Sequence, residues 1–464
     1  MSKRTIVCAC ASLLILSLTS IPAYATKDQM SIEEIQKKLQ ALSSQVQNLS
    51  TVVKNQDKII KQQKIELDAQ KRVSKEDLEE VKKIASENGS NVKITMKPMP
   101  KIEAIDGKYS FQPFGRVHLD STQFNDDKKD HANNSNFRRA RLGFKGKLGK
   151  DFKYKSEVDF AEEKVNFKEM SLTYTGLKTT DIKIGNQKPS LGMKQSTSSN
   201  YIMFMERSAA INAFTRSEVI GIDTISSGDN WSLRAGIFNE DAGNDDTGED
   251  EDVSFDVRGS INALGLYNPE TSNVLHLGLG VSRRLPTGSV RFKAKPAGDG
   301  DSIVDTGSIS SVDDVTIYGL EAAAILGPVS FQSEYFKADL NRSNANKDAS
   351  FDGYYAQGSW IITGEQRPYK KGYFGRLKPK NPLDIKGGNY GAWEILARYE
   401  NLDLNDEDAN ITGGELNNIS FGVNLYLTDH IRLMANVIDV NTDNKAVVAD
   451  DDPTVYNFRT QWDF

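Results

Sequence analysis

The sequence predicts an all-β transmembrane barrel of about 16 antiparallel strands, preceded by an N-terminal α-helical coiled coil. Three observations lead to this fold class: a secretory signal, about sixteen segments in which apolar and polar residues alternate, and an aromatic-terminated last segment that ends at Phe464. Alternation with a period of two is typical of a strand with one apolar and one polar face. Strands of a membrane barrel have this pattern because one face contacts lipid and the other a polar lumen.

Residues 1–25 have the layout of a secretory signal peptide: positive charges, a long apolar run and a small-x-small triplet ending at Ala25. Cys8 and Cys10 lie inside this segment, so the mature chain after cleavage would contain no cysteine. Disulfides and thiol metal sites are therefore not expected, and we expect no metal and no cofactor. The net charge of −6 at pH 7 argues against nucleic acid as a partner.

Residues 26–105 are expected to form a coiled coil in the periplasm, followed by a linker with two prolines. Between residues 30 and 70 the apolar residues fall on alternating steps of four and three or on whole heptads, a spacing typical of coiled coils. These residues are Ile35, Leu39, Leu42, Val46, Leu49, Val53, Ile60 and Leu67. The segment would be either a trimerisation stalk or spacer, or a detachable helical arm without a role in transport.

Residues 106–464 are expected to form the barrel, and an even number of strands is the rule for single-chain outer-membrane barrels. The predicted strands are 110–124, 137–148, 152–159, 169–174, 181–186, 221–226, 233–238, 257–267, 275–282, 314–326, 329–338, 351–363, 392–402, 418–427, 431–440 and 455–464. Their connections should alternate between long extracellular loops and short periplasmic turns. Residues 364–391 break this rule, because they are long and basic on the periplasmic side. They are predicted either to fold back into the lumen or to form a solvated loop.

The stretch 136–160 carries positive charge on one face of two successive strands, and a residue of the first strand joins it. The basic residues on this shared face are Arg116, Arg139, Arg141, Lys145, Lys147, Lys153 and Lys155. In a soluble sandwich this face would be ordinary solvated surface. In a barrel it becomes lumen, where charged N–H donors replace the water that an oxyanion loses.

Two long loops bear on the expected pore. Residues 187–220 contain Lys194 and Arg207 and are predicted to fold inward as the constriction. Residues 239–256 contain a dense run of Asp and Glu. We expect a solvated outer loop there, with a divalent-cation bridge to lipopolysaccharide as one reading, and at the pore mouth it would repel anions.

From residue 114 to the C-terminus the chain resembles the phosphate-selective porins O and P. The matching stretches, in family order, are FGRVHLD, FRRARLGFKGKLGKDFKYKSEVDFA, GLKTTDIKIGNQKPSLGMKQSTSSN, FMERS, GYYAQGSWIITGEQRPY and GAWEILARYE. The resemblance implies a trimeric 16-stranded barrel in the outer membrane of a Gram-negative bacterium, with inward-folded loops and a ladder of basic residues that conducts anions. By motif it places Arg116 in the ladder and Arg138, Arg139, Lys153 and Lys378 at the central site.

Two positions depart from the family's pattern. The family's lysine in the long loop aligns with Gln195, one position from Lys194. A central carboxylate of the best-known members aligns with Lys168, whose alternation points it outward unless a bulge intervenes. These departures bear on phosphate selectivity and leave the expected anion preference unchanged.

The leading functional hypothesis is a homotrimeric porin that passively conducts phosphate or similar anions and is embedded in outer-membrane lipid and lipopolysaccharide. Its alternatives are a general diffusion porin with weak ion preference and a structural envelope spacer tethered through its coiled coil. An outer-membrane hydrolase is the enzyme alternative. The four histidines, His118, His131, His276 and His430, lie in separate segments with no nucleophile or metal-ligand spacing beside them, so we predict no enzymatic activity.

Overall fold

The computed structural model describes residues 92–96, 98–239, 252–296, 302–344, 346–443 and 451–464, and near the N-terminus residues 40, 44, 52–56 and 60–62. The chain divides into two units, Met1–Ser90 and Asn91–Phe464. The described residues of the first unit are helical. The signal peptide, most of the coiled coil and the acidic run at 240–251 lie outside the described residues, so all three stay predictions.

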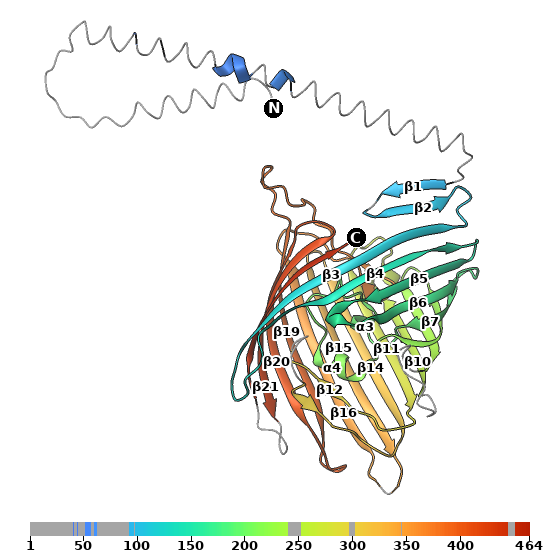
Figure 1. Ribbon diagram of the computed structural model, residues 1–464. Helices are drawn as coiled ribbons and strands as arrows, with labels where there is room; N and C mark the ends of the chain where they lie inside the picture. Colours follow the sequence, from blue (N-terminus) through green and yellow to red (C-terminus); the bar gives the residue numbers. More distant parts are fainter. Residues whose placement is uncertain are drawn as a thin grey trace, which may run out of the picture. The chain divides into compact units, whose positions relative to one another are not determined.

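In the second unit, sixteen antiparallel strands of the described chain form a closed barrel (Figure 1). Each strand pairs with the next along the chain, and the last pairs with the first, for example Asn457 with Thr122. The strands are β3 (Ser110–Asn125), β4 (Asn134–Leu148), β5 (Phe152–Asp159), β6 (Asn166–Tyr174), β7 (Thr180–Gln187), β8 (Val219–Ser227), β9 (Trp231–Phe238), β10 (Val253–Asn262), β11 (Val274–Leu285), β14 (Val312–Leu326), β15 (Val329–Arg342), β16 (Ala349–Ile361), β19 (Ala392–Asp406), β20 (Ile411–Tyr426), β21 (Ile431–Asp443) and β22 (Thr454–Asp463).

The sixteen predicted strands are confirmed, with one clear error in extent. The sequence predicts the eighth strand to continue to residue 267, but β10 ends at Asn262 and residues 263–267 form the short helix α5 (Ala263–Tyr267). The partner strands end here, because Ile261 pairs with the first residue of β9, Trp231. The alternating apolar pattern of the sequence therefore continues past Asn262, where β9 no longer offers a residue to pair with.

Shorter elements occupy the ends and interior of the barrel. These are β1 (Val92–Met96), β2 (Pro100–Ala104), η1 (Ala161–Glu163), α3 (Met193–Ser196), α4 (Ala209–Phe214), β12 (Lys293–Ala294), β13 (Val304–Asp305), β17 (Tyr369–Lys370) and β18 (Tyr373–Phe374). β1 and β2 form a hairpin where the sequence predicts a linker, and β2 pairs with the start of β3 through Ile102 and Phe111.

The barrel is apolar outside and polar inside, as alternation predicts. In β20, Ile419 and Phe421 are 47% and 61% exposed, whereas Asn418 and Ser420, which alternate with them, are fully buried. Because an exposed apolar belt is stable in lipid and not in water, this surface indicates a membrane-spanning barrel. Among the described helices, none has the length and apolar character needed to cross a membrane.

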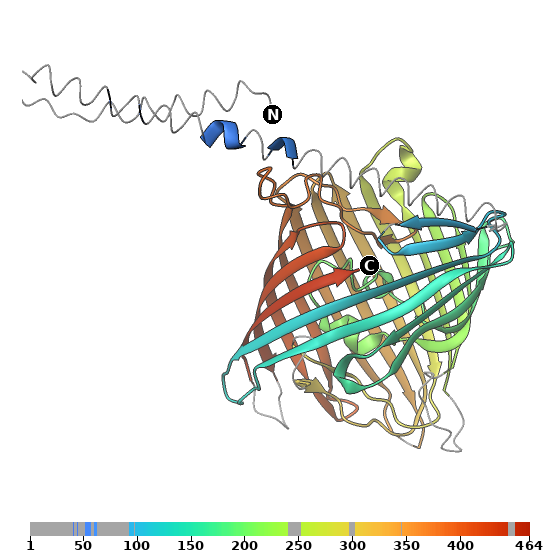
Figure 2. The same cartoon turned by 45° about the horizontal axis from the view of Figure 1, so that its top comes forward.

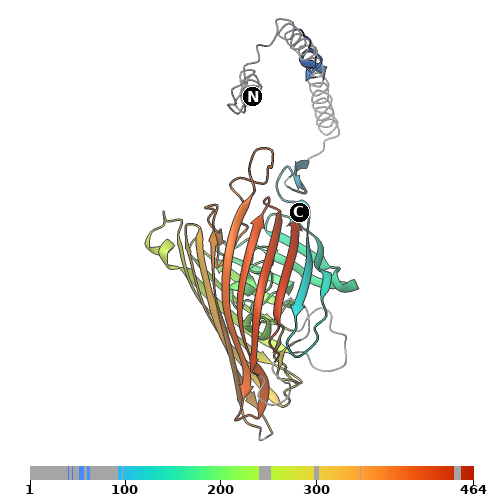
Figure 3. The same ribbon diagram turned by 90° about the vertical axis from the view of Figure 1, so that its left-hand side faces the viewer.

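Both ends of the barrel chain, the start of β3 and the end of β22, lie on one side, which is the periplasmic side in barrels of this kind. Figure 3 shows the last strands from the side, with the C-terminus at their upper ends. The long loop 188–218, which contains α3 and α4, folds into the barrel from the opposite side (Figure 2). Residues 362–391 enter it from the periplasmic side as far as the turn at Lys371-Gly372, so of the two alternatives for 364–391 the structure shows the inward fold for this part, whereas residues 382–388 are exposed.

Candidate functional site

A bulge in β4 turns two successive arginines toward the lumen. His118 of β3 pairs with Arg139, and Leu119 pairs with Phe137, so Arg138 is an extra residue in the ladder. Such a bulge interrupts alternation and redirects side chains. Arg139 donates to Glu206 Oε1 of loop 188–218 at 2.9 Å, and Arg138 Nη2 lies 3.4 Å from Oε2. Strict alternation would have pointed Arg138 outward.

A second bulge, in β6, has the same effect on Lys168. Ser156 of β5 pairs with Met170, and Val158 pairs with Phe167, so two residues of β6 lie opposite Glu157. Lys168 Nζ is 3.7 Å from Glu218 Oε2, at the end of loop 188–218. Its neighbour Glu169 contacts Lys155 and Lys183 at 2.6 and 2.5 Å. Both β6 residues therefore face the lumen, against the outward direction that alternation gives Lys168.

Arginines of the last strands hold loop 188–218 by its backbone. Arg398 of β19 donates to the carbonyl of Glu206 at 3.1 Å, Arg432 of β21 to that of Ile202 at 3.0 Å, and Arg459 of β22 to that of Met205 at 2.5 Å. All three guanidinium groups are buried. These charges fix the loop against the wall.

The other margin of the loop is tied to the first and last strands. Arg116 donates to the hydroxyl oxygens of Ser198 and Ser199 at 3.2 and 3.1 Å, and the ring of His118 bonds to Asn200 at 3.0 Å. Asn200 in turn donates to Asp463 at 2.9 Å. These contacts tie the loop to the wall from β19 to β22 and on to β3, with Arg116 at its edge.

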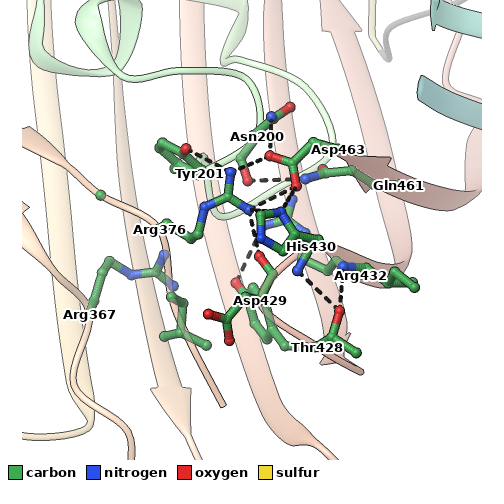
Figure 4. Close-up of a pocket in the computed structure, with 14 residues that line it drawn as sticks. Asn200, Tyr201, Arg367, Arg376, Thr428, Asp429, His430, Arg432, Gln461 and Asp463 are labelled. Carbon is green, nitrogen blue, oxygen red and sulfur yellow. Dashed lines mark hydrogen bonds and ion pairs between the residues drawn. The ribbon is translucent and has the colours of Figure 1, made fainter. Parts of the chain in front are cut away.

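The inward-folded periplasmic connection is clamped to the same place. Arg376 donates to both carboxylate oxygens of Asp463, to Tyr201 of the loop at 3.1 Å and to the backbone carbonyl of Asp429 at 2.5 Å (Figure 4). His430 Nδ1 lies 3.1 Å from Asp463 as well. One guanidinium therefore joins the connection, the loop and the last strand.

The tip of this connection reaches the lumen wall. β17 and β18 form a hairpin whose turn, Lys371-Gly372, has positive φ at both residues, 53° and 85°. The Gly372 carbonyl accepts from Arg258 at 2.9 Å, and Tyr369 bonds to His276 at 2.8 Å. A Cβ on Gly372 would lie 2.5 Å from Ser260 Oγ, so the contact requires glycine.

One side of the lumen is filled by apolar side chains. Ile211 and Phe214 of α4 pack with Phe292 from the connection between β11 and β14 against the inward faces of the strands that follow, including Ile317 and Phe336. The two lumen cavities described next are lined on the wall by β3 to β10 instead.

The outer cavity, of about 250 Å³, lies toward the extracellular ends of β4 and β6, and the inner cavity, of about 380 Å³, toward the periplasm. They share Arg141, Lys188, Ser199 and Glu218. Thirteen basic side chains line the two together: Arg116, Arg138, Arg139, Arg141, Lys155, Lys168, Lys183, Lys188, Arg207, Arg216, Arg234, Arg258 and Lys371. Four acidic side chains, Glu157, Glu169, Glu206 and Glu218, accompany them. Basic side chains therefore outnumber acidic ones in the lining, and three of the thirteen, Arg216, Arg234 and Arg258, also pair with carboxylates outside it.

The charge state of the shared boundary follows from its neighbours. Burial raises the pKa of Glu218, but the charges of Lys188, Arg141 and Lys168 outweigh it and lower this pKa to about 2. Glu218 is therefore ionised at neutral pH. Limited access to bulk water and the nearby charge of Arg207 lower the pKa of Lys188 well below its usual range.

The comparison with known proteins agrees with this geometry. The family model described as phosphate-selective porin O and P matches residues 111–464. Porin O of Pseudomonas aeruginosa is 30% identical over 399 residues, covering 77% of this chain and 88% of that protein. The chain belongs to the phosphate-selective porin O and P family. An uncharacterised protein of Caulobacter vibrioides is 27% identical, over 74% of this chain and 70% of its own length.

Among solved structures, a loop-deletion mutant of the Vibrio cholerae outer-membrane protein OmpT shares the fold, with a TM-score of 0.50 and 12% identity over 77% of this chain and all of that one. As a member of the porin O and P family with a closed lipid-facing barrel, the chain is an anion porin of the outer membrane.

Most of the predicted site residues of this porin line the cavities, and the others lie elsewhere. Seven of the predicted residues line the cavities: Arg116, Arg138, Arg139, Arg141, Lys155, Lys168 and Arg207. Lys145 lies beside them, with its ammonium group 5.2 Å from the centre of the Phe114 ring. Lys153 is exposed near the periplasmic end of β5, where it pairs with Lys147.

Lys153 therefore does not lie at the central site that the resemblance implies, and two further placements also correct the prediction. Lys194 is 1% exposed, because its ammonium group donates to Gln357 at 3.0 Å and lies 4.2 Å from the centre of the Tyr355 ring, so it fixes the loop to the wall. Lys378 lies at the periplasmic rim, 67% exposed and 3.2 Å from Asp429. The connection reaches its innermost point near Lys371 and has returned to the periplasmic rim by Lys378. Lys371, and not Lys378, therefore lines the inner cavity.

Sequence reasoning also missed residues that the cavities contain, notably Lys183, Lys371, Glu206 and Glu218. Lys183 lies on the same face of β7 as Asp181, and this alternation of polar residues could have identified it as a lumen residue. Glu206 lies inside the FMERS motif. Nothing in the local pattern marks Lys371 or Glu218, because their positions depend on how two loops fold inward.

Proposed function

We propose that this porin passively conducts phosphate or similar small oxyanions along the wall formed by β3 to β10. The observation that carries the proposal is the excess of basic over acidic side chains in the two adjoining cavities, in a chain whose overall net charge is −6. The chain concentrates basic side chains around these two cavities.

The arrangement suits an oxyanion that passes in steps. Guanidinium and ammonium groups make charge-assisted hydrogen bonds of about 1.5–3 kcal/mol each with an oxyanion, which offset the water it loses. Each carboxylate in the cavities lies within 4.0 Å of at least two basic groups and competes with the ion for them. Sites of moderate strength in series allow both entry and exit.

The test is a planar-bilayer measurement on the mature protein. Its reversal potential under a salt gradient should show anion selectivity, and added phosphate should block the chloride current in a saturable way. Arg139→Gln should raise the half-blocking phosphate concentration about three- to tenfold, because one charged donor is lost from the outer cavity. Lys153→Gln removes the same charge at the periplasmic end of β5 and should change it less than about twofold.

A cation-selective or unselective wild-type pore that phosphate does not block would contradict the proposal. That outcome would favour the general diffusion porin, in which carboxylates such as Glu206 and Glu157 neutralise the basic groups beside them.

We also propose a homotrimer in contact with outer-membrane lipid and lipopolysaccharide, with the helical segment before residue 90 in the periplasm. The exposed apolar belt and the helical state of residues 52–56 and 60–62 support this arrangement. Chemical cross-linking of the protein in native membranes tests it, since three linked copies are expected.

A further inference from the structure

Glu218 occupies the boundary between the two cavities. It is the last residue before β8, it is 7% exposed, and it lines both cavities together with Arg141 and Lys188. An ion that moves between the outer and the inner cavity passes this carboxylate.

The contacts of Glu218 differ in length from those of the other cavity carboxylates. Its oxygens lie 3.7 Å from Lys168 Nζ and 3.9 Å from Lys188 Nζ, beyond hydrogen-bond length. Glu157, Glu169 and Glu206 each contact a basic group at 2.9 Å or less. The two ammonium groups at the boundary are therefore attracted by Glu218 without donating a hydrogen bond to it.

The two members of this contact come from different parts of the fold. The β6 bulge directs Lys168 from the barrel wall into the lumen. The carboxylate opposite it, Glu218, is supplied by the end of loop 188–218.

We propose that Glu218 is the specificity-determining residue of the boundary, a role that rests on the proposed anion conduction. It competes with a passing oxyanion for Lys168 and Lys188 and so limits how long the ion stays. A phosphate ion can accept from both ammonium groups at once and must displace the attraction of Glu218 from both. Phosphate carries more negative charge than chloride at neutral pH, so Glu218 repels it more strongly and weakens phosphate binding more than chloride binding.

Glu218→Gln removes this competition with little change of shape. The half-blocking phosphate concentration should fall about tenfold, because one negative charge within a few ångströms of the ion is lost, whereas chloride conductance should change less than about twofold. Asp223→Asn is the matched control. Like Glu218→Gln, this substitution removes one negative charge, here on the lumen face of β8, where Asp223 binds Arg234. Its effect on the half-blocking phosphate concentration should be less than about threefold.

A charge exchange separates this role from a general effect of net charge. Lys168→Glu alone should weaken phosphate block about tenfold, since two carboxylates then face each other, whereas the double variant K168E/E218K restores one charge of each sign at the contact. The double variant should return to within about threefold of the wild-type half-blocking concentration. Heat-dependent gel mobility would establish that each variant forms a folded barrel.

The outcomes are distinct. If the wild-type pore is anion-selective and blocked by phosphate, but Glu218→Gln behaves like Asp223→Asn or the double variant is not restored, the role of Glu218 is refuted and the proposed function stands. If the wild-type pore is not anion-selective, both proposals fail.

Discussion

Single residues in this lumen act as members of charged groups, and Glu206 is the clearest case. Its carboxylate accepts hydrogen bonds from Arg139 at 2.9 Å and Arg459 at 2.6 Å, while Arg138 lies 3.4 Å away. Removing one partner from a buried ion pair leaves uncompensated charge and costs about 3–5 kcal/mol. Glu206 is partly open to the cavity, which reduces that cost.

Glu206→Gln should therefore lower barrel stability by about 2–3 kcal/mol and strengthen phosphate block at the same time. Urea unfolding in detergent, followed by gel mobility, measures the first effect, and the bilayer titration measures the second. Glu270→Gln, in an exposed periplasmic turn, is the control. An unchanged unfolding midpoint for Glu206→Gln would mean that the arginine group does not need this carboxylate.

Lys188 gives the pore a pH dependence. Since its pKa is lowered, it loses its proton at a lower pH than an ordinary lysine, and the positive charge it contributes is lost as pH rises through that lowered value. Anion selectivity of the wild type should fall over this range. The difference between wild type and Lys188→Gln should shrink as the pH is raised, and a difference that stays constant up to pH ~10.4, the usual lysine pKa, would contradict the assignment.

At the scale of elements, alternation was enough to predict the sixteen strands, because one face must be apolar and the other polar in every one of them. It could not predict where the alternation is interrupted. The bulge at Arg138 leaves one trace in the sequence, two adjacent arginines in a strand that otherwise alternates. The bulge at Lys168 leaves the adjacent charges of Lys168 and Glu169.

The contacts made by the inward-folded segments were beyond prediction for another reason. Arg398, Arg432 and Arg459 lie on the lumen face of their strands, but they bind carbonyls of loop 188–218. Which arginines face ions and which hold a loop depends on tertiary distances between segments about 200 residues apart.

The hairpin of β17 and β18 should narrow the pore from the periplasmic side. Gly372→Val would place side-chain atoms against Ser260 and would impose a branched residue at a φ of 85°, so the tip should leave the wall. Single-channel recordings should then show a larger and noisier conductance with weaker anion selectivity, because Lys371 moves with the tip. Gly288→Ala, where nothing lies within 4 Å of the added atom, is the control and should match wild type.

At the scale of the whole molecule, the barrel closes through its own strands. β22 pairs with β3, and the backbones of Phe464 and Gly115 exchange hydrogen bonds at 2.9 and 3.0 Å. The ring of sixteen strands therefore closes with strands from residue 110 onward.

A variant that lacks residues 26–90 but keeps the signal peptide and the β1–β2 hairpin should insert into the outer membrane with wild-type conductance and phosphate block. Bilayer recordings and cross-linking of the truncated protein test this. Loss of linked trimers with retained conductance would assign trimerisation to the helical segment, whereas loss of conductance would show that the barrel needs that segment to assemble.

Because apolar side chains fill one side of the lumen, the two halves of the chain contribute differently to the pore. Residues that line the two cavities come mainly from positions 116–258, whereas those that hold loop 188–218 in place come mainly from 292–459. Preference for a different solute could thus evolve by substitutions in the first half of the chain, while the second half preserves the scaffold. A chimaera that joins the first half of one family member to the second half of another should inherit its selectivity from the first.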